Sequence, residues 1–238
     1  ENGVVAGVPL ALEAFRLLDP KVSIRVDCED GSRVKKGEPV LFVTGHARGL
    51  LSAERVALNY MQRLSGIATL TRAYVDAIPS GASTRITDTR KTTPGLRALE
   101  RYAVRCGGGH NHREDLSSAV LIKDNHIAAS GGIEQAIARA RERAPHTSRI
   151  ECEVESMSEL DQALAAGADV VLLDNFADSD LDAAVARVAG RALIEVSGRV
   201  SLERVTKIAK AGVSVISVGA LTHSARAVDL GLDWEAGA

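Results

Sequence analysis

Two short stretches of the sequence gather cations that could bind an anion. Arg90 and Lys91 stand side by side before a Pro-Gly turn. Further along, three glycines precede His110, His112 and Arg113. Neighbouring cations repel one another and lose hydration when they are buried, so a bound anion is the natural partner for them. Because Arg113 is adjacent, we interpret the two histidines as anion-binding residues rather than as metal ligands.

Polar residues also recur where apolar runs of the sequence end. In chain order, the ends of six runs hold Asp88, Arg90 and Lys91; Lys123, Asp124 and Asn125; Glu151, Glu153 and Glu155; Asp174 and Asn175; Ser197-Gly198; and Gly219. Cations come first, carboxylates follow, and small residues come last. This order suits a polyanionic substrate, a divalent metal and a phosphate held by backbone N–H groups.

An alternation of strands and helices would position these residues. Runs rich in Val, Ile and Leu predict strands at 83–87, 119–123, 149–154, 168–174, 191–197 and 213–219. Helical patterns lie between them at 95–104, 133–144, 158–166, 181–188 and 202–211. We therefore expect a parallel sheet buried on both faces, in a closed or nearly closed α/β barrel whose strand ends share one mouth. A doubly wound open sheet is the alternative, but no G-x-G-x-x-G follows the first strand.

The first part of the chain has a different pattern. Residues 6–17 predict a helix, 22–27 predict a strand, and Gly31 and Gly37 mark turns around short β segments. Ser52 is expected to N-cap a long helical region that reaches Ile78, and Gly66 is expected to interrupt it.

Composition excludes several classes of function. The chain has 238 residues, 45% of them apolar and 25% charged, with a net charge of −2. No global basic field favours nucleic acid or a membrane surface, and no apolar run reaches the ~20 residues of a membrane span. No signal peptide is visible, and the three scattered cysteines, interpreted as buried reduced thiols, fit neither a disulfide framework nor a zinc site. These features predict a cytoplasmic protein.

Six motifs, in order, resemble the quinolinate phosphoribosyltransferases. They are ERVALNYMQRLSGIAT (54–69), TRKTTPGLRALERYAVRCGGGHNHR (89–113), LIKDNHI (121–127), ECEVES (151–156), LLDNF (172–176) and VGALTHSARAVDLGLD (218–233). The resemblance implies a type II phosphoribosyltransferase fold, with an incomplete α/β barrel and an N-terminal α/β sandwich. The implied domains are the sandwich at 1–58, the barrel at 59–226, and a tail at 227–238 that returns to the sandwich.

The same resemblance implies an activity. Family members convert quinolinate and phosphoribosyl pyrophosphate into nicotinate mononucleotide, pyrophosphate and carbon dioxide in de novo NAD synthesis, with Mg²⁺. They act as homodimers or hexamers with shared active sites. Quinolinate would contact Arg90, His112, Arg113 and Lys123, with Arg55 reaching over from a partner subunit.

The remaining roles also come from the resemblance. Lys91 would contact the pyrophosphate. Glu153 and Asp174 would hold Mg²⁺, directly or through water, and contact the ribose; with Lys123 they form the expected catalytic set. The 5′-phosphate would be held by Ser197, Gly198, Gly219 and His223.

Two departures and three alternatives accompany this assignment. The family normally carries a few dozen more residues at its start, so a trimmed or disordered terminus is expected. Arg199 stands where the family usually has the second glycine of Ser-Gly-Gly. A Schiff-base aldolase acting through Lys123 is the runner-up chemistry, a non-catalytic anion-binding barrel is another, and a paralogue for a different pyridine carboxylate is the third.

Overall fold

A computed structural model describes residues 1–234, and its contacts divide the chain into two compact units. Unit 1 comprises Glu1–Ala73, Lys91–Gly109 and the segment from Ala220 onward; unit 2 comprises Tyr74–Arg90 and His110–Gly219. Each unit thus combines separate stretches of sequence. The domain boundaries predicted from the sequence, at residues 58 and 226, stay predictions.

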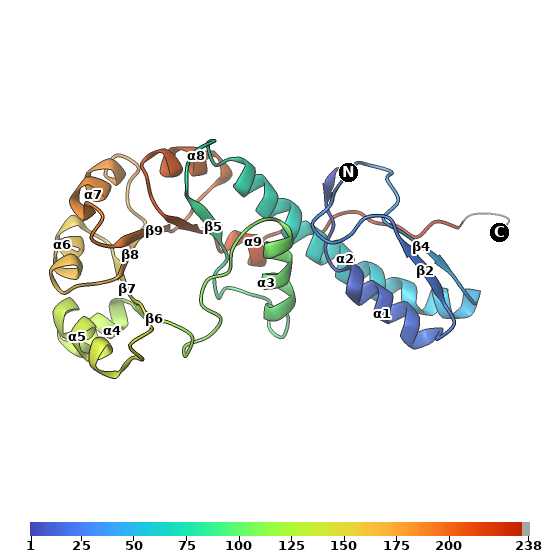
Figure 1. The fold of residues 1–238 in the computed structure, drawn as a ribbon, viewed down its shortest axis with the longest axis horizontal. Helices are drawn as coiled ribbons and strands as arrows, with labels where there is room; N and C mark the ends of the chain where they lie inside the picture. Colours follow the sequence, from blue (N-terminus) through green and yellow to red (C-terminus); the bar gives the residue numbers. More distant parts are fainter. Residues whose placement is uncertain (235–238) are drawn as a thin grey trace. The chain divides into compact units, whose positions relative to one another are not determined.

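Unit 2 is built on six parallel strands, each of which lies within a predicted run. They are β5 (Arg85–Thr87), β6 (Val120–Ile122), β7 (Ile150–Val154), β8 (Val170–Asp174), β9 (Leu193–Ser197) and β10 (Val215–Ser217). Their spatial order is β5-β10-β9-β8-β7-β6, so the first two strands of unit 2 in chain order form the two edges. Among the described residues β5 and β6 do not pair, and the barrel is incomplete, as Figure 1 shows.

Helices connect the strands of unit 2 and cover the outside of their arc (Figure 1). They are α4 (Asp124–Ser130), α5 (Ile133–Arg143), α6 (Met157–Ala165), α7 (Leu181–Val188) and α8 (Leu202–Lys210). The sequence did not predict α4, and the reason is physical: none of its residues is buried, so it carries no apolar periodicity.

The register of the strands sorts the side chains of unit 2 onto two different faces. Glu151 pairs with Leu121 and Val170, and Glu195 pairs with Leu172. Paired residues point to the same face, and alternate residues of a strand point to opposite faces. Glu151, Glu153 and Glu195 therefore share one face of the sheet. The opposite face is apolar and buried, with Ile150, Cys152, Val154, Val171, Leu173, Ile194, Val196, Ile216 and Ile86. The sheet is largely buried on both faces, as expected, but the two faces differ: one is apolar and packs on helices, and the other carries buried glutamates.

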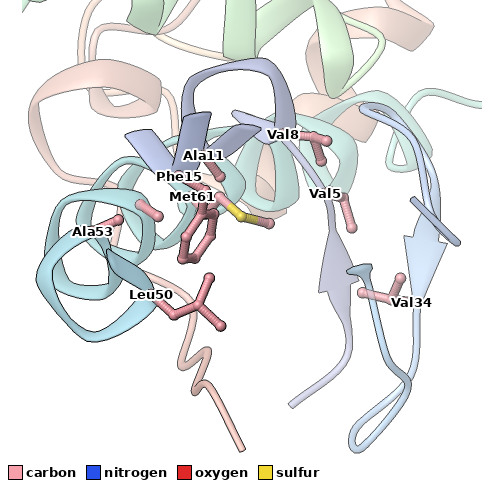
Figure 2. Close-up of a cluster of buried hydrophobic side chains, with 9 residues drawn as sticks. Val5, Val8, Ala11, Phe15, Val34, Leu50, Ala53 and Met61 are labelled. Carbon is pink, nitrogen blue, oxygen red and sulfur yellow. The ribbon is translucent and has the colours of Figure 1, made fainter. Parts of the chain in front are cut away.

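Unit 1 contains two small antiparallel sheets and most of the longest helix. The sheets pair β1 (Gly3–Val4) with β3 (Arg33–Val34) and β2 (Ser23–Val26) with β4 (Leu41–Thr44). The helices are α1 (Val8–Leu18), α2 (Ala47–Asp76), α3 (Arg97–Cys106) and the short α9 (Ala220–His223). Figure 2 shows the core, in which Phe15 of α1 lies against Leu50 and Met61 of α2.

The long helix α2 corrects two expectations about its course. Ser52 does not cap it, because the helix begins at Ala47 and the Ser52 hydroxyl donates to the Arg48 carbonyl inside it. Gly66 does not interrupt it either. A Cβ at position 66 would lie 2.1 Å from the carbonyl oxygen of Arg226, so the glycine permits a close approach of two backbones.

The segment after α9 makes that approach. The Val228 amide donates to the Gln62 carbonyl at 3.0 Å, and the Gln62 side chain donates to the Leu230 carbonyl at 2.7 Å. This part of the chain therefore packs along α2 through backbone as well as side-chain contacts.

Cysteine burial differs from the expectation of three buried thiols. Cys152 is buried, whereas Cys28 and Cys106 are half-buried, and all three are free. Within the described part of the chain, no helix is long and apolar enough to cross a membrane.

We predict that Gly66→Ala lowers the free energy of unfolding by about 1–3 kcal/mol, because the new methyl group forces the Arg226 backbone away. This loss should outweigh the gain in helix propensity of about 1 kcal/mol. Urea unfolding followed by circular dichroism measures it. Gly231→Ala is the control, since a Cβ there meets nothing within 4 Å. A Gly66→Ala protein as stable as the wild type would contradict the close approach.

Candidate active site

A buried aspartate joins the two cation-bearing stretches of unit 2. Asp88, which follows β5, is fully buried. Its Oδ1 accepts the His112 amide at 2.7 Å, and its Oδ2 accepts the Asn111 side chain at 2.6 Å. The loop that carries His112 and Arg113 is thereby fixed to the strand end that leads into Arg90. From the sequence, Asp88 was predicted only as a polar strand end without a role in the site.

His112 lies between two buried carboxylates from the inner face of the sheet. Its Nε2 is 3.6 Å from Glu151 Oε2 and 3.4 Å from Glu195 Oε1. Burial alone lowers the pKa of His112, but hydrogen bonding and charge from the two glutamates raise that pKa to about 10. Burial and the charge of Glu195 in turn raise the pKa of Glu151, although the His112 contact lowers it.

The other ring nitrogen of His112 is also engaged by the protein. The Arg113 amide donates to Nδ1 at 2.8 Å, so this nitrogen presents its lone pair in the present arrangement. Full protonation of the ring, which the pKa near 10 favours at neutral pH, requires the Arg113 amide to leave Nδ1. Nε2 faces the two carboxylates, whereas Nδ1 faces the Arg113 amide, so Nδ1 is the nitrogen whose role changes when the ring is fully protonated.

Arg90 and Arg113 form the cationic part of the cluster. Burial lowers the pKa of Arg113, and the positive charge of Arg90 lowers it further. The two guanidinium groups are thus close enough for each charge to oppose the other. Arg113 also donates to the Ala119 carbonyl at 3.3 Å, which turns it toward the start of β6. Such a pair favours an anion that neutralises both charges.

Lys123 is not the buried lysine that the aldolase alternative needs at a strand end. Its side chain is 45% exposed and forms an ion pair with Glu153, which lies on the neighbouring strand β7. An ion pair with a carboxylate stabilises the ammonium form, whereas Schiff-base formation needs the neutral amine. The geometry of Lys123 thus suits anion binding better than aldolase chemistry.

The described residues offer two groups of carboxylates that could face a metal ion. His112, Glu151 and Glu195 have ligand atoms within 4.8 Å of one another, but their contacts make them an ion-pair cluster. Glu153 and Asp174 are the predicted pair. Glu153 is in register with Leu172, so Asp174 lies two residues further along the same face.

Glu153 and Asp174 fit Mg²⁺ as hard oxygen ligands. Glu153 also pairs with Lys123, and the Asp174 carboxylate accepts the Asn175 side chain at 2.6 Å. Each carboxylate therefore keeps a protein partner, which suits contact with the metal through water more than direct ligation.

The turn after β9 is tightly constrained. A Cβ on Gly198 would lie 2.3 Å from Asn175 Oδ1, and Gly198 has a φ of 90°, so this position requires glycine. Arg199 follows with a φ of 46°, although it is not a glycine. Arg204 pairs with Asp178 at 2.7 Å and donates to the Gly198 and Arg199 carbonyls, which braces the turn.

A cavity of about 410 Å³ lies at this turn. It is lined by Asn175, Phe176, Gly198, Arg199 and Arg204. The two arginines give it a positive lining, and Ser197 directly precedes the turn at the end of β9.

The remaining predicted residues fall in both units. Gly219 follows β10 in unit 2, whereas Arg55, Lys91 and His223 belong to unit 1. All three are exposed. The Lys91 carbonyl accepts the Thr222 hydroxyl at 2.7 Å, and His223 Nδ1 lies 2.6 Å from the Ser224 hydroxyl. Unit 2 thus brings together Arg90, His112 and Arg113, and it pairs Lys123 with Glu153.

Sequence reasoning assigned no role to Glu151 or Glu195. Both were detectable from the alternation of charged and apolar residues in their runs, which predicts one polar face.

We predict that His112→Ala lowers the free energy of unfolding by about 3–5 kcal/mol, because Glu151 and Glu195 lose the partner between them. Chemical denaturation at neutral pH measures this loss. Adding Glu151→Gln to the same variant should restore part of it, since one buried charge disappears. If the double variant is no more stable than His112→Ala, the charges of Glu151 and Glu195 do not repel each other in the fold.

Comparison with known proteins covers both parts of the chain. The model of the quinolinate phosphoribosyl transferase N-terminal domain matches residues 1–65, and that of the C-terminal domain matches residues 67–233.

Relatives agree in sequence and in structure. A nicotinate-nucleotide pyrophosphorylase [carboxylating] from Mycobacterium leprae is 49% identical, over 98% of this chain and 83% of its own. A probable enzyme of the same name from Bacillus subtilis is 45% identical, over 98% and 80%.

Among solved structures, NadC from Streptococcus pyogenes has a TM-score of 0.92 at 44% identity, over 96% of this chain and 81% of its own. The nicotinate-nucleotide pyrophosphorylase from Ehrlichia chaffeensis has a TM-score of 0.94 at 42% identity, over 98% and 84%. With both family models matched in order, the chain belongs to the quinolinate phosphoribosyl transferase family.

Proposed function

We propose that this chain transfers the phosphoribosyl group of phosphoribosyl pyrophosphate to quinolinate and decarboxylates the product. The products are nicotinate mononucleotide, pyrophosphate and carbon dioxide. Near-full-length relatives carry the name of this activity. The observation that carries the proposal within the fold is the close pair Arg90 and Arg113, with the half-buried His112 next to Arg113 in the chain, a set suited to a small dianion.

The chemistry explains why cations dominate the site. The pyridine nitrogen of quinolinate attacks C1 of the ribose while pyrophosphate departs, and this nitrogen carries no proton, so no general base is needed. The protein therefore has to hold two anions together and stabilise the leaving charge. Once the ring nitrogen is cationic, its charge stabilises the carbanion left at C2 when carbon dioxide leaves, and uptake of a proton at C2 completes nicotinate mononucleotide.

In this proposal Arg90 and Arg113 bind the quinolinate carboxylates as charge-assisted donors. His112 joins them when a carboxylate replaces the Arg113 amide at Nδ1: Nδ1 then takes up a proton from solvent, which the raised pKa of the ring favours, and donates it to that carboxylate. Lys123 turns from Glu153 toward the substrate, which frees the Glu153 carboxylate for the ribose or the metal.

The other substrate is assigned to the remaining predicted residues. Glu153 and Asp174 would hold Mg²⁺ through water, and the ion would offset charge on the pyrophosphate oxygens. Lys91 would contact the pyrophosphate. The 5′-phosphate would be held by Ser197, Gly198, Gly219 and His223.

The assembly and location are also proposals. A homodimer or hexamer would let Arg55, exposed on α2, reach the site of a partner subunit. A cytoplasmic location agrees with the three free cysteines, since reduced thiols suit that compartment.

Incubation of the purified protein with quinolinate, phosphoribosyl pyrophosphate and Mg²⁺ tests the function. Carbon dioxide and nicotinate mononucleotide should appear in equal amounts. Acceptance of nicotinic acid instead of quinolinate would favour the paralogue. Borohydride trapping of a carbonyl substrate on Lys123 would favour the aldolase, which the ion pair with Glu153 argues against.

We predict opposite effects of Arg199→Gly on stability and on substrate binding. Glycine relieves the left-handed backbone, so the free energy of unfolding should rise by about 0.5–1 kcal/mol. The KM for phosphoribosyl pyrophosphate should rise roughly 2- to 5-fold, because one exposed cation beside the phosphate is lost. Steady-state kinetics and urea unfolding measure the two effects.

Ala189→Gly is the matched control, because Ala189 has a φ of 49° at the end of α7. It should stabilise the protein similarly and leave the KM unchanged. If Arg199→Gly also leaves the KM unchanged, Arg199 takes no part in phosphate binding.

A further inference from the structure

An ion pair in unit 1, between a buried carboxylate and a half-buried guanidinium, contacts two segments that carry proposed phosphate-binding residues. Glu100 of α3 is fully buried, and its Oε1 accepts Arg63 Nη2 of α2 at 2.7 Å. Taking two charges out of water costs free energy that their attraction alone seldom recovers. Such a pair is therefore explained by what else it holds in place.

Glu100 holds the loop that contains Lys91. The Thr93 amide donates to Glu100 Oε2 at 3.0 Å, and the Thr93 hydroxyl donates to Oε1 at 2.7 Å. Thr93 lies two residues after Lys91. With the Arg63 contact, the carboxylate receives three donors, which fix its orientation and that of the loop.

Arg63 holds the segment that contains His223. Its Nη1 donates to the Ala225 carbonyl at 2.9 Å, and its Nη2 donates to the Thr222 carbonyl. These two carbonyls flank His223 along the chain. The planar guanidinium binds Glu100 and both carbonyls at once, which an ammonium group on a flexible stem does less well.

Thr222 closes the network. Its buried hydroxyl donates to the Lys91 carbonyl at 2.7 Å, while its own carbonyl accepts Arg63. The loop of Lys91 and the helix α9 are thus joined directly as well as through the ion pair. The side chains of Lys91 and His223 are exposed, but their backbone segments are both anchored at Thr222.

We propose that Arg63 and Glu100 are positioning residues that fix the separation between Lys91 and His223. This inference rests on the proposed function, in which Lys91 binds the pyrophosphate and His223 the 5′-phosphate of one substrate molecule. Two donors held at a set separation bind both ends of a polyanion without losing conformational entropy at each turnover. The pair acts on phosphoribosyl pyrophosphate through these residues and does not touch it.

Arg63→Lys tests the proposal, because it keeps the charge but removes the fork. We expect the KM for phosphoribosyl pyrophosphate to rise about 10-fold or more, while the KM for quinolinate changes less than about 2-fold. Thr93→Val and Thr222→Val are milder variants that remove only a hydroxyl from the network, with an expected rise of about 5-fold. Calorimetry of phosphoribosyl pyrophosphate binding provides a measurement besides turnover. If Arg63→Lys fails to fold, the two threonine variants test the positioning role in its place.

Arg141→Lys is the matched control in unit 2. Arg141 pairs with Asp169 at 2.8 Å and donates to the Gly167 carbonyl, before the start of β8. It should lower the melting temperature without changing either KM. If the Arg63, Thr93 and Thr222 variants do the same, or raise both KM values equally, the positioning role is wrong. A wild-type protein that binds no phosphoribosyl pyrophosphate would instead overturn the proposed function.

Discussion

Charge neutralisation inside an incomplete barrel is the constraint on which the site depends. The inner face of the unit 2 sheet carries Glu151, Glu153 and Glu195, and buried carboxylates are costly unless cations or donors accompany them. His112 lies between two of these glutamates, and Lys123 pairs with the third. The groups proposed to bind the substrate are thus the groups that neutralise these buried carboxylates. Substrate binding would exchange one set of anionic partners for another.

Buried carboxylates also position the loops. Asp88 accepts an amide and a side chain from the loop of His112, and Glu100 accepts an amide and a hydroxyl from the loop after Lys91. Asp30 follows the same rule at the start of α1, where it accepts the Gly7 and Val8 amides as well as the Tyr102 hydroxyl. A charged acceptor holds several donors in one geometry, so each loop has a single arrangement. Loops that must bind anions repeatedly benefit from that rigidity.

Prediction from the sequence was accurate where local chemistry decides structure. All six strands of the barrel lie within the predicted runs, because Val, Ile and Leu in short runs favour buried strands. Prediction was wrong where a segment distant in the sequence determines the local structure. Ser52 has the chemistry of a cap but lies inside α2, and Gly66 looks like a helix breaker but accommodates the Arg226 backbone. The helix α4 was missed because it buries nothing.

The sequence determined the elements of this protein, their order and, through six motifs, its family. It also identified the residue types that an anion-binding site needs. The tertiary structure decided which of these residues meet. Parallel register places Glu151 and Glu195, far apart along the chain, beside the same nitrogen of one histidine. Local propensity acts between near neighbours, whereas the partner of a buried charge is set by strand pairing and loop anchoring over long separations.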